Sequence, residues 1–199
     1  HPTGVGLWRL SKDAKRVYFV TADTVDQDEK ARIEKKFTVD VRNAARPVSS
    51  LWATDLSLSA TPRAATRLTR DTTYAVTGFT LSDDGRSIGF TGVANDRYKR
   101  NVTEQGIYGD LYLLDVASGA IERLTNNAET GESALSFSPD SRLMAFSASD
   151  DMTAYNMKNR RVYVRPVADK GAAWRKIGDL DGDVSVGWWS RDGKTIYFN

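Results

Sequence analysis

Apolar and polar residues alternate in many short runs along this chain, which is the period of β-strands that bury one face. The run LSFSPDSRLMAFSASDD shows the pattern clearly. Leu135 and Phe137 precede a Ser-Pro-Asp-Ser-Arg segment, and Met144 and Phe146 follow it with the same spacing of two. Pro139 presets the φ angle at the second position of a type I turn, and the Asp after it can bond its own backbone two residues on. The run therefore predicts a strand, a tight turn and a second strand.

The same unit occurs four times without gaps. Each copy has a Ser, an Asp two residues later, a basic residue two after the Asp and a Phe six after it, and the apolar positions around them recur as well. The copies contain Ser11, Asp13, Lys15 and Phe19; Ser82, Asp84, Arg86 and Phe90; Ser138, Asp140, Arg142 and Phe146; and Ser190, Asp192, Lys194 and Phe198. Self-similarity of this kind is the signature of a repeat architecture.

Two further short runs follow each of the first three hairpins. The first run has an aromatic residue at one fixed place, Trp52, Tyr112 or Tyr163. The second reads ATRLT, IERLT and, more loosely, WRKIGDL. Four antiparallel strands per repeat predict a β-propeller blade, since stacking blades around an axis buries the faces of sheets that are too small to stand alone.

We therefore expect an all-β fold, a β-propeller of four-stranded antiparallel blades. An ordinary β-sandwich is the alternative, but it does not require the same Ser-x-Asp-x-basic signature once per repeat. The predicted blades cover about residues 7–70, 75–127 and 132–180, and a fourth begins at about 183–199. Because propellers close with about 4–8 blades, three and a half blades indicate a fragment of a larger propeller.

Composition narrows the function classes. The chain has 28 Lys and Arg against 26 Asp and Glu, a formal net charge of +2, which does not indicate a nucleic-acid-binding protein. No apolar run has the length of a membrane span. There are no cysteines, which excludes disulfides and thiolate chemistry and leaves the compartment open, with a periplasmic or secreted location favoured slightly over a cytoplasmic one.

The repeats differ in length at one place only, between the second and third strands. The three segments there are 22–50, 92–109 and 148–161, and the first is highly charged and could include a helical turn or a strand through KKFTVDV. In an up-and-down blade this connection lies on the same face as the link to the next blade. We expect this face to meet a substrate or another domain, although plain solvated loops would look the same. Its candidate contact residues are Arg97, Tyr98, Arg100 and Tyr155.

Catalytic signatures are not found. The only histidine is His1, and no Gly-x-Ser-x-Gly nucleophile elbow occurs, since GESAL at 131–135 lacks the second Gly. The alternating aspartates of GDLDGDVS resemble a calcium loop weakly but lack its downstream Glu, and a tight turn explains them better. We expect no catalytic residue, metal site or cofactor in these 199 residues.

The motifs FSPDSRLMAFSASDD, DLYLLDVASGAIERLT and LSDDGRSIGFTG, with long inserts between strands two and three, resemble the N-terminal propeller of the prolyl oligopeptidase family of serine peptidases, especially acylaminoacyl-peptidase-like and dipeptidyl-peptidase-like members. The resemblance covers essentially the whole chain. It implies a propeller that gates short peptide substrates, a C-terminal α/β-hydrolase domain in the same parent chain that carries a Ser-His-Asp triad, and a possible homo-oligomer. The Glu pair by which dipeptidyl peptidases of the family hold the substrate amino terminus is not present here.

A non-enzymatic propeller like the Tol-system periplasmic protein is the alternative, since it shares the Ser-Pro-Asp-Gly hairpin and the RLT strand. Such propellers have compact, uniform repeats. The 71-residue distance from Asp13 to Asp84, against 56 and 52 for the next two, favours the peptidase. A polysaccharide-degrading propeller would need histidines or clustered carboxylates at strand starts, and the chain offers few.

Overall fold

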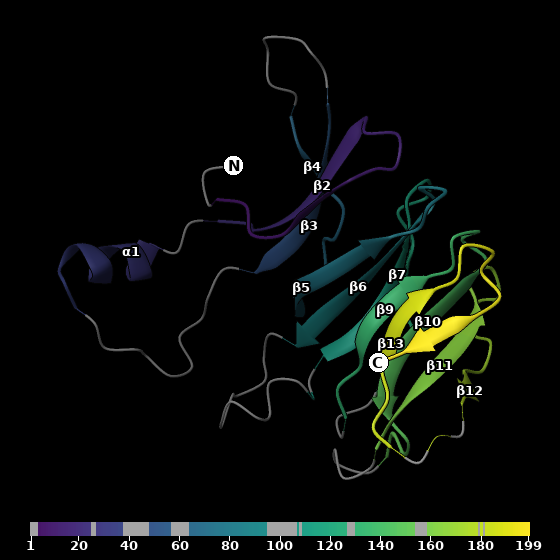
Figure 1. The fold of residues 1–199 in the computed structure, drawn as a ribbon. Helices are drawn as coiled ribbons and strands as arrows, with labels where there is room; N and C mark the ends of the chain where they lie inside the picture. Colours follow the sequence, from purple (N-terminus) through teal and green to yellow (C-terminus); the bar gives the residue numbers. More distant parts are fainter. Residues whose placement is uncertain are drawn as a thin grey trace.

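The computed structural model describes residues 4–24, 27–37, 48–56, 64–94, 107, 109–126, 130–153, 159–178, 180 and 182–199. They form three four-stranded antiparallel sheets and a two-stranded hairpin, each with its strands in chain order (Figure 1). This is the all-β architecture of a partial β-propeller, as the repeats predict. In the part of the chain that the structure describes, no helix is long and apolar enough to cross a membrane.

Blade one contains β1 (Trp8–Leu10), β2 (Arg16–Ala22), β3 (Ser49–Asp55) and β4 (Thr66–Arg67). Blade two contains β5 (Tyr74–Leu81), β6 (Ser87–Ala94), β7 (Gly109–Asp115) and β8 (Ile121–Arg123). Blade three contains β9 (Ser133–Phe137), β10 (Leu143–Ser149), β11 (Arg160–Pro166) and β12 (Arg175–Ile177), and the last hairpin contains β13 (Val186–Trp189) and β14 (Ile196–Phe198). Of the two elements considered for the first insert, the helix is present as α1 (Gln27–Glu34), which stands apart from the sheets in Figure 1. Most of the KKFTVDV segment lies outside the described residues.

The repeated Ser and Asp shape the first turn of every blade in the same way. In blade three, the Ser141 amide closes a turn onto the Ser138 carbonyl, with Pro139 at its second position. The Ser138 hydroxyl donates to Asp140 at 2.6 Å and accepts from the Leu143 amide at 2.9 Å. The Arg142 amide donates to Asp140 at 3.1 Å. The residue after the Asp has a positive φ in each copy, and it is Ala14, Gly85, Ser141 or Gly193.

The repeated apolar residues pair across the strands as the spacing predicts. The cross-strand pairs Leu10–Val17, Leu81–Ile88, Phe137–Met144 and Trp189–Ile196 recur from blade to blade. The Phe of the second strand faces the aromatic residue of the third in the pairs Phe19–Trp52, Phe90–Tyr112 and Phe146–Tyr163. In blades two and three these two rings stack, with centroids 5.0 and 5.3 Å apart.

Three separate apolar clusters lie between successive blades and form the core. The first joins blades one and two through residues such as Tyr18, Leu51 and Phe79, and the second joins blades two and three through residues such as Leu111 and Phe146. The third joins blade three to the last hairpin. Each sheet therefore depends on its neighbour for burial, as expected of a propeller.

Candidate functional site

The strand order gives the molecule two faces. The short hairpins between the first and second strands lie on one, which we call the turn face. The connections between the second and third strands, and the links to the next blade, lie on the other, which we call the loop face. The link from β10 to β11 runs from Ser149 to Arg160, and that from β2 to β3 from Ala22 to Ser49, whereas the turn-face hairpins span about five residues each.

In blade one, an arginine clamp fixes the sheet at the loop face. Arg67 forms an ion pair with Asp23 at 2.6 Å, and its Nε donates to the Thr69 carbonyl at 2.7 Å. The Thr69 hydroxyl accepts from the Leu51 amide at 2.9 Å. The Arg and Thr of the RLT motif thus hold the fourth strand to the third.

Blade two repeats this clamp. Arg123 pairs with Asp110 at 2.5 Å and donates through Nε to the Thr125 carbonyl at 3.1 Å, and the Thr125 hydroxyl accepts from the Leu111 amide at 2.9 Å. It also donates to the buried carboxylate of Glu132 at 3.0 Å. Burial by itself would lower the pKa of Arg123, but its hydrogen bond to Asp110 raises the pKa above the ordinary value, so the guanidinium stays charged.

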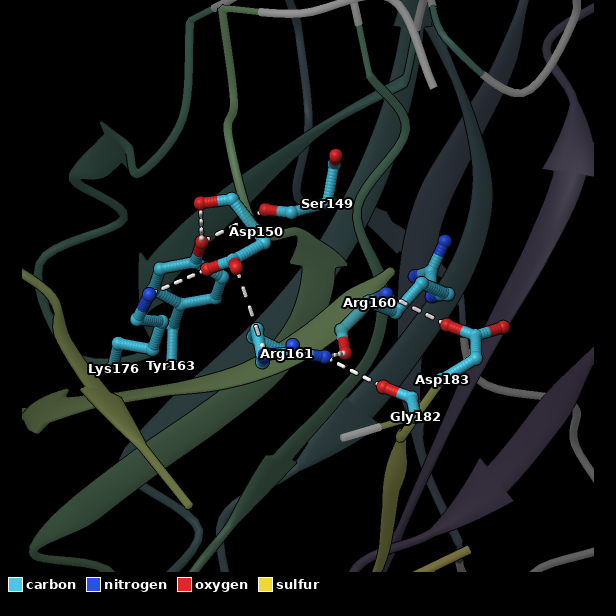
Figure 2. A network of polar contacts seen from close by, with 8 residues as sticks. All are labelled: Ser149, Asp150, Arg160, Arg161, Tyr163, Lys176, Gly182 and Asp183. Carbon is cyan, nitrogen blue, oxygen red and sulfur yellow. Dashed lines mark hydrogen bonds and ion pairs between the residues drawn. The ribbon is translucent and has the colours of Figure 1, made fainter. Parts of the chain in front are cut away.

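In blade three the clamp becomes a wider network around Asp150 (Figure 2). Lys176 occupies the place of the clamp arginine, since it pairs with Tyr163 as Arg123 pairs with Tyr112. Its Nζ lies 2.5 Å from one Asp150 oxygen, and Arg161 Nε lies 3.7 Å from the other. The sequence predicts the strand that carries Lys176 but not the network, because the acid Asp150 comes from a different part of the blade, directly after β10.

The same network reaches the link to the last hairpin. Arg161 donates to the Gly182 carbonyl at 2.6 Å, and the Arg160 amide donates to Asp183 at 2.7 Å (Figure 2). Asp183, the last aspartate of the GDLDGDVS segment, therefore caps a strand start, while Asp179 and Asp181 lie outside the described residues. Among the described residues no group of three or more His, Cys, Asp or Glu side chains could hold a metal.

Tyr163 completes the network from the core side. Its hydroxyl donates to the Ser149 carbonyl at 2.8 Å and lies 3.2 Å from that of Asp150. Burial raises the pKa of this phenol, so it stays protonated and acts as a donor. Chemically, the network ties the base of the β10–β11 loop to the blade and to the next link, which is a scaffold for that loop.

The four residues predicted to contact a substrate or another domain, Arg97, Tyr98, Arg100 and Tyr155, lie outside the described residues. They stand in the β6–β7 and β10–β11 connections. Their role stays a prediction. The strands that flank these connections end at Ala94 and Ser149 and begin again at Gly109 and Arg160.

Comparison with solved structures identifies the fold. TolB from Acinetobacter baumannii matches at 17% identity over 98% of this chain and 37% of its own, with a TM-score of 0.57. A prolyl endopeptidase matches at 14% identity over 98% of this chain and 25% of its own, with a TM-score of 0.60. The acylaminoacyl peptidase of Pyrococcus horikoshii matches at 15% identity over 98% and 27%, with a TM-score of 0.56.

The structural neighbours are therefore propeller domains of prolyl oligopeptidases and acylaminoacyl peptidases together with TolB-like propellers. At these identities the likeness shows the β-propeller fold alone. The chain spans between a quarter and two fifths of the length of these three proteins. No protein-family model and no curated protein matches the sequence.

Proposed function

We propose that this chain is the substrate-gating propeller part of a serine peptidase of the prolyl oligopeptidase type, which cleaves short peptides. The observation that supports the proposal is the asymmetry of the two faces. The connection between the second and third strands, on the loop face, is the longest one in each of the three blades, and in the first blade it contains α1. A face decorated in this way suits contact with a catalytic domain and with the peptide between them.

The charged side chains of the loop face suit a structural role. The acids and bases of the described clamps are engaged with one another, so they position loops rather than transfer protons. The triad and the oxyanion hole of such a peptidase would belong to an α/β-hydrolase domain of the parent chain.

Fluorophosphonate labelling of the intact natural protein tests the proposal. A labelled serine in a species well above 22.1 kDa supports a serine hydrolase that contains these blades. An intact parent that is not labelled contradicts it.

The deletion of residues 26–42 adds a second test of the loop face, because a parent that keeps every activity and contact without this segment excludes a role for the first insert.

A TolB-like binding propeller is the alternative function. The two TolB structures match at 17% and 19% identity, slightly above the 12–15% of the peptidases named in these comparisons. In that case the parent protein would not react with the fluorophosphonate, and its loop face would bind a protein partner. Deletion of residues 26–42 would then abolish capture of that partner.

A further inference from the structure

A cleft of about 880 Å³ lies on the turn face between blades one and two. Its volume is in the range of ligand pockets, about 300–1,000 Å³. Arg16, Tyr18 and Asp55 line it from blade one, and Asp83 and Asp84 from blade two. It is on the opposite side of the sheets from the loop face.

One position beside the cleft differs among the repeats. Five residues after the anchor Asp, blade two has Gly89 and blade three has Ala145, whereas blade one has Tyr18. A Cβ at Gly89 would lie 2.3 Å from Leu135, so blade three packs directly against the backbone there. Blade one has the much larger Tyr18 at this position, and its buried ring lies in the apolar cluster between blades one and two.

The turns differ as well. The Asp84 amide of blade two donates to the Ser141 hydroxyl of blade three at 3.1 Å, and this bond joins the two turns. The residue that corresponds to Ser141 in blade two is Gly85, which has no hydroxyl to join its turn to that of blade one. A Cβ at Gly85 would meet no atom within 4 Å, so the space beside this turn is open.

The two walls of the cleft carry different charges. On the blade-one wall, Lys12, Lys15 and Arg16 outnumber the two carboxylates Asp13 and Asp55. The lining residues that blade two contributes include Asp83 and Asp84 and no cation. A net positive wall therefore faces a negative one across the opening.

These charges are available to a ligand to different degrees. Arg16 is committed to Asp55 at 2.7 Å. The pair between Lys12 and Asp83 spans the cleft at 2.7 Å, but the two side chains are 68% and 47% exposed, so a ligand can replace it at little cost. Lys15 forms no ion pair with any described residue.

We propose that this cleft binds a small zwitterion, such as an amino acid or a short peptide with free termini. The carboxylate lies toward Lys12 and Lys15, and the ammonium toward Asp83 and Asp84. Leu56 and Val116, which also line the cleft, contact the apolar part of the ligand. The site is separate from the loop face and does not depend on the proposed peptidase function.

Isothermal titration of the intact protein with alanyl-leucine tests the site. Saturable binding is expected with a Kd of about 1 mM or tighter, and the N-acetylated, C-amidated dipeptide should bind at least about tenfold more weakly. Lys15→Met and Asp83→Asn should each weaken binding of the free dipeptide by a similar factor. Both positions are on the surface, and circular dichroism checks that the variants are folded.

Lys194→Met is the matched control, because Lys194 has the position of Lys15 in the turn of the last hairpin, away from the cleft. It should leave the affinity unchanged. The proposal is wrong if no saturable heat appears, if the blocked dipeptide binds equally well, or if the Lys15 and Asp83 variants bind like the wild type. The last result would place any dipeptide binding at another site, including a catalytic one.

Discussion

Individual residues of the Ser-x-Asp signature each have a defined role. The hydroxyl accepts from an amide across the turn and donates to the carboxylate, and the carboxylate accepts from the amide of the basic residue. The basic residue contributes its backbone in all four copies, and its side chain reaches the Asp only in blade three, where Arg142 Nε lies 2.7 Å from Asp140. The signature is therefore a structural motif of the turn.

Replacement of Ser138 by Ala should destabilise the protein by about 1–2 kcal/mol, because it leaves the Leu143 amide without its side-chain acceptor in a buried turn. Urea unfolding followed by tryptophan fluorescence measures the difference. Ser190→Ala makes the same change in the more exposed turn of the last hairpin and should cost less. Equal effects at the two positions would contradict the importance of burial.

The turn carboxylates should make stability depend on acid pH. Hydrogen bonds from the Ser138 hydroxyl and from Arg142 lower the pKa of Asp140 from 3.8 to about 2. Since the folded-state pKa is the lower one, the stabilisation is complete above pH 3.8 and is lost as the pH falls toward 2. Asp140→Asn should flatten the fall in unfolding free energy between these values, as measured by urea titrations at several pH values. A variant with an unchanged slope would assign the acid sensitivity elsewhere.

At the scale of elements, the residue five after each anchor Asp differs in size from blade to blade. Leu135 of the next blade packs against the backbone at Gly89, whereas blade one has the buried Tyr18 ring at the same position. Tyr197 occupies the same position in the last hairpin, where it stacks on Trp188 at 5.2 Å and both rings are exposed. Strands that are equivalent in hydrogen bonding thus differ in how they pack.

Gly89→Ala should destabilise the protein by about 1–3 kcal/mol, because the added methyl group overlaps Leu135 in the interface of blades two and three. Thermal unfolding by calorimetry measures the change. Gly78→Ala is the control in the paired strand β5, since a Cβ there meets nothing within 4 Å. If both variants unfold alike, the close contact at Gly89 does not determine the packing.

At the scale of the whole molecule, blades two and three are joined by a buried ion pair at the outer rim. Arg165 of β11, with a side chain 3% exposed, lies 2.7 Å from Glu122 of β8. Its guanidinium also packs over Trp174, 5.0 Å from the ring centroid, and the Trp174 indole donates to the Leu124 carbonyl at 3.3 Å. This junction has several direct links besides its apolar cluster.

Glu122→Gln should lower the unfolding free energy by about 3 kcal/mol, because it leaves the Arg165 charge buried without a counterion. The double variant Glu122→Gln/Arg165→Met should recover much of this loss, since it removes the charge itself. Denaturant unfolding of the three proteins measures both effects. A double variant less stable than the single one would show that the arginine is held chiefly by Trp174.

Much of the fold can be predicted because its determinants are local. The turn at Ser138, Pro139 and Asp140 is held by hydrogen bonds between residues close in the chain, and the apolar alternation beside it predicts the two strands. The third strand of each blade follows from the fixed place of Trp52, Tyr112 or Tyr163 in the repeat. The Asp150 network cannot be read in this way, because Lys176, Arg161 and Asp183 come from three segments. Nothing in the spacing indicates which acid meets which base.

The sequence by itself therefore determined the blade, its turns, its register and the number of repeats, since short-range hydrogen bonds and a period of two act within one hairpin. Only the tertiary structure decided between which blades a cleft lies and between which blades side chains pack against the backbone. A cleft lies beside Tyr18, whereas Leu135 packs on Gly89, because the volume available at each position depends on sheets that are distant in the chain. The charges of Lys15 and Asp83 face each other for the same reason, because packing brings two separate turns to one opening.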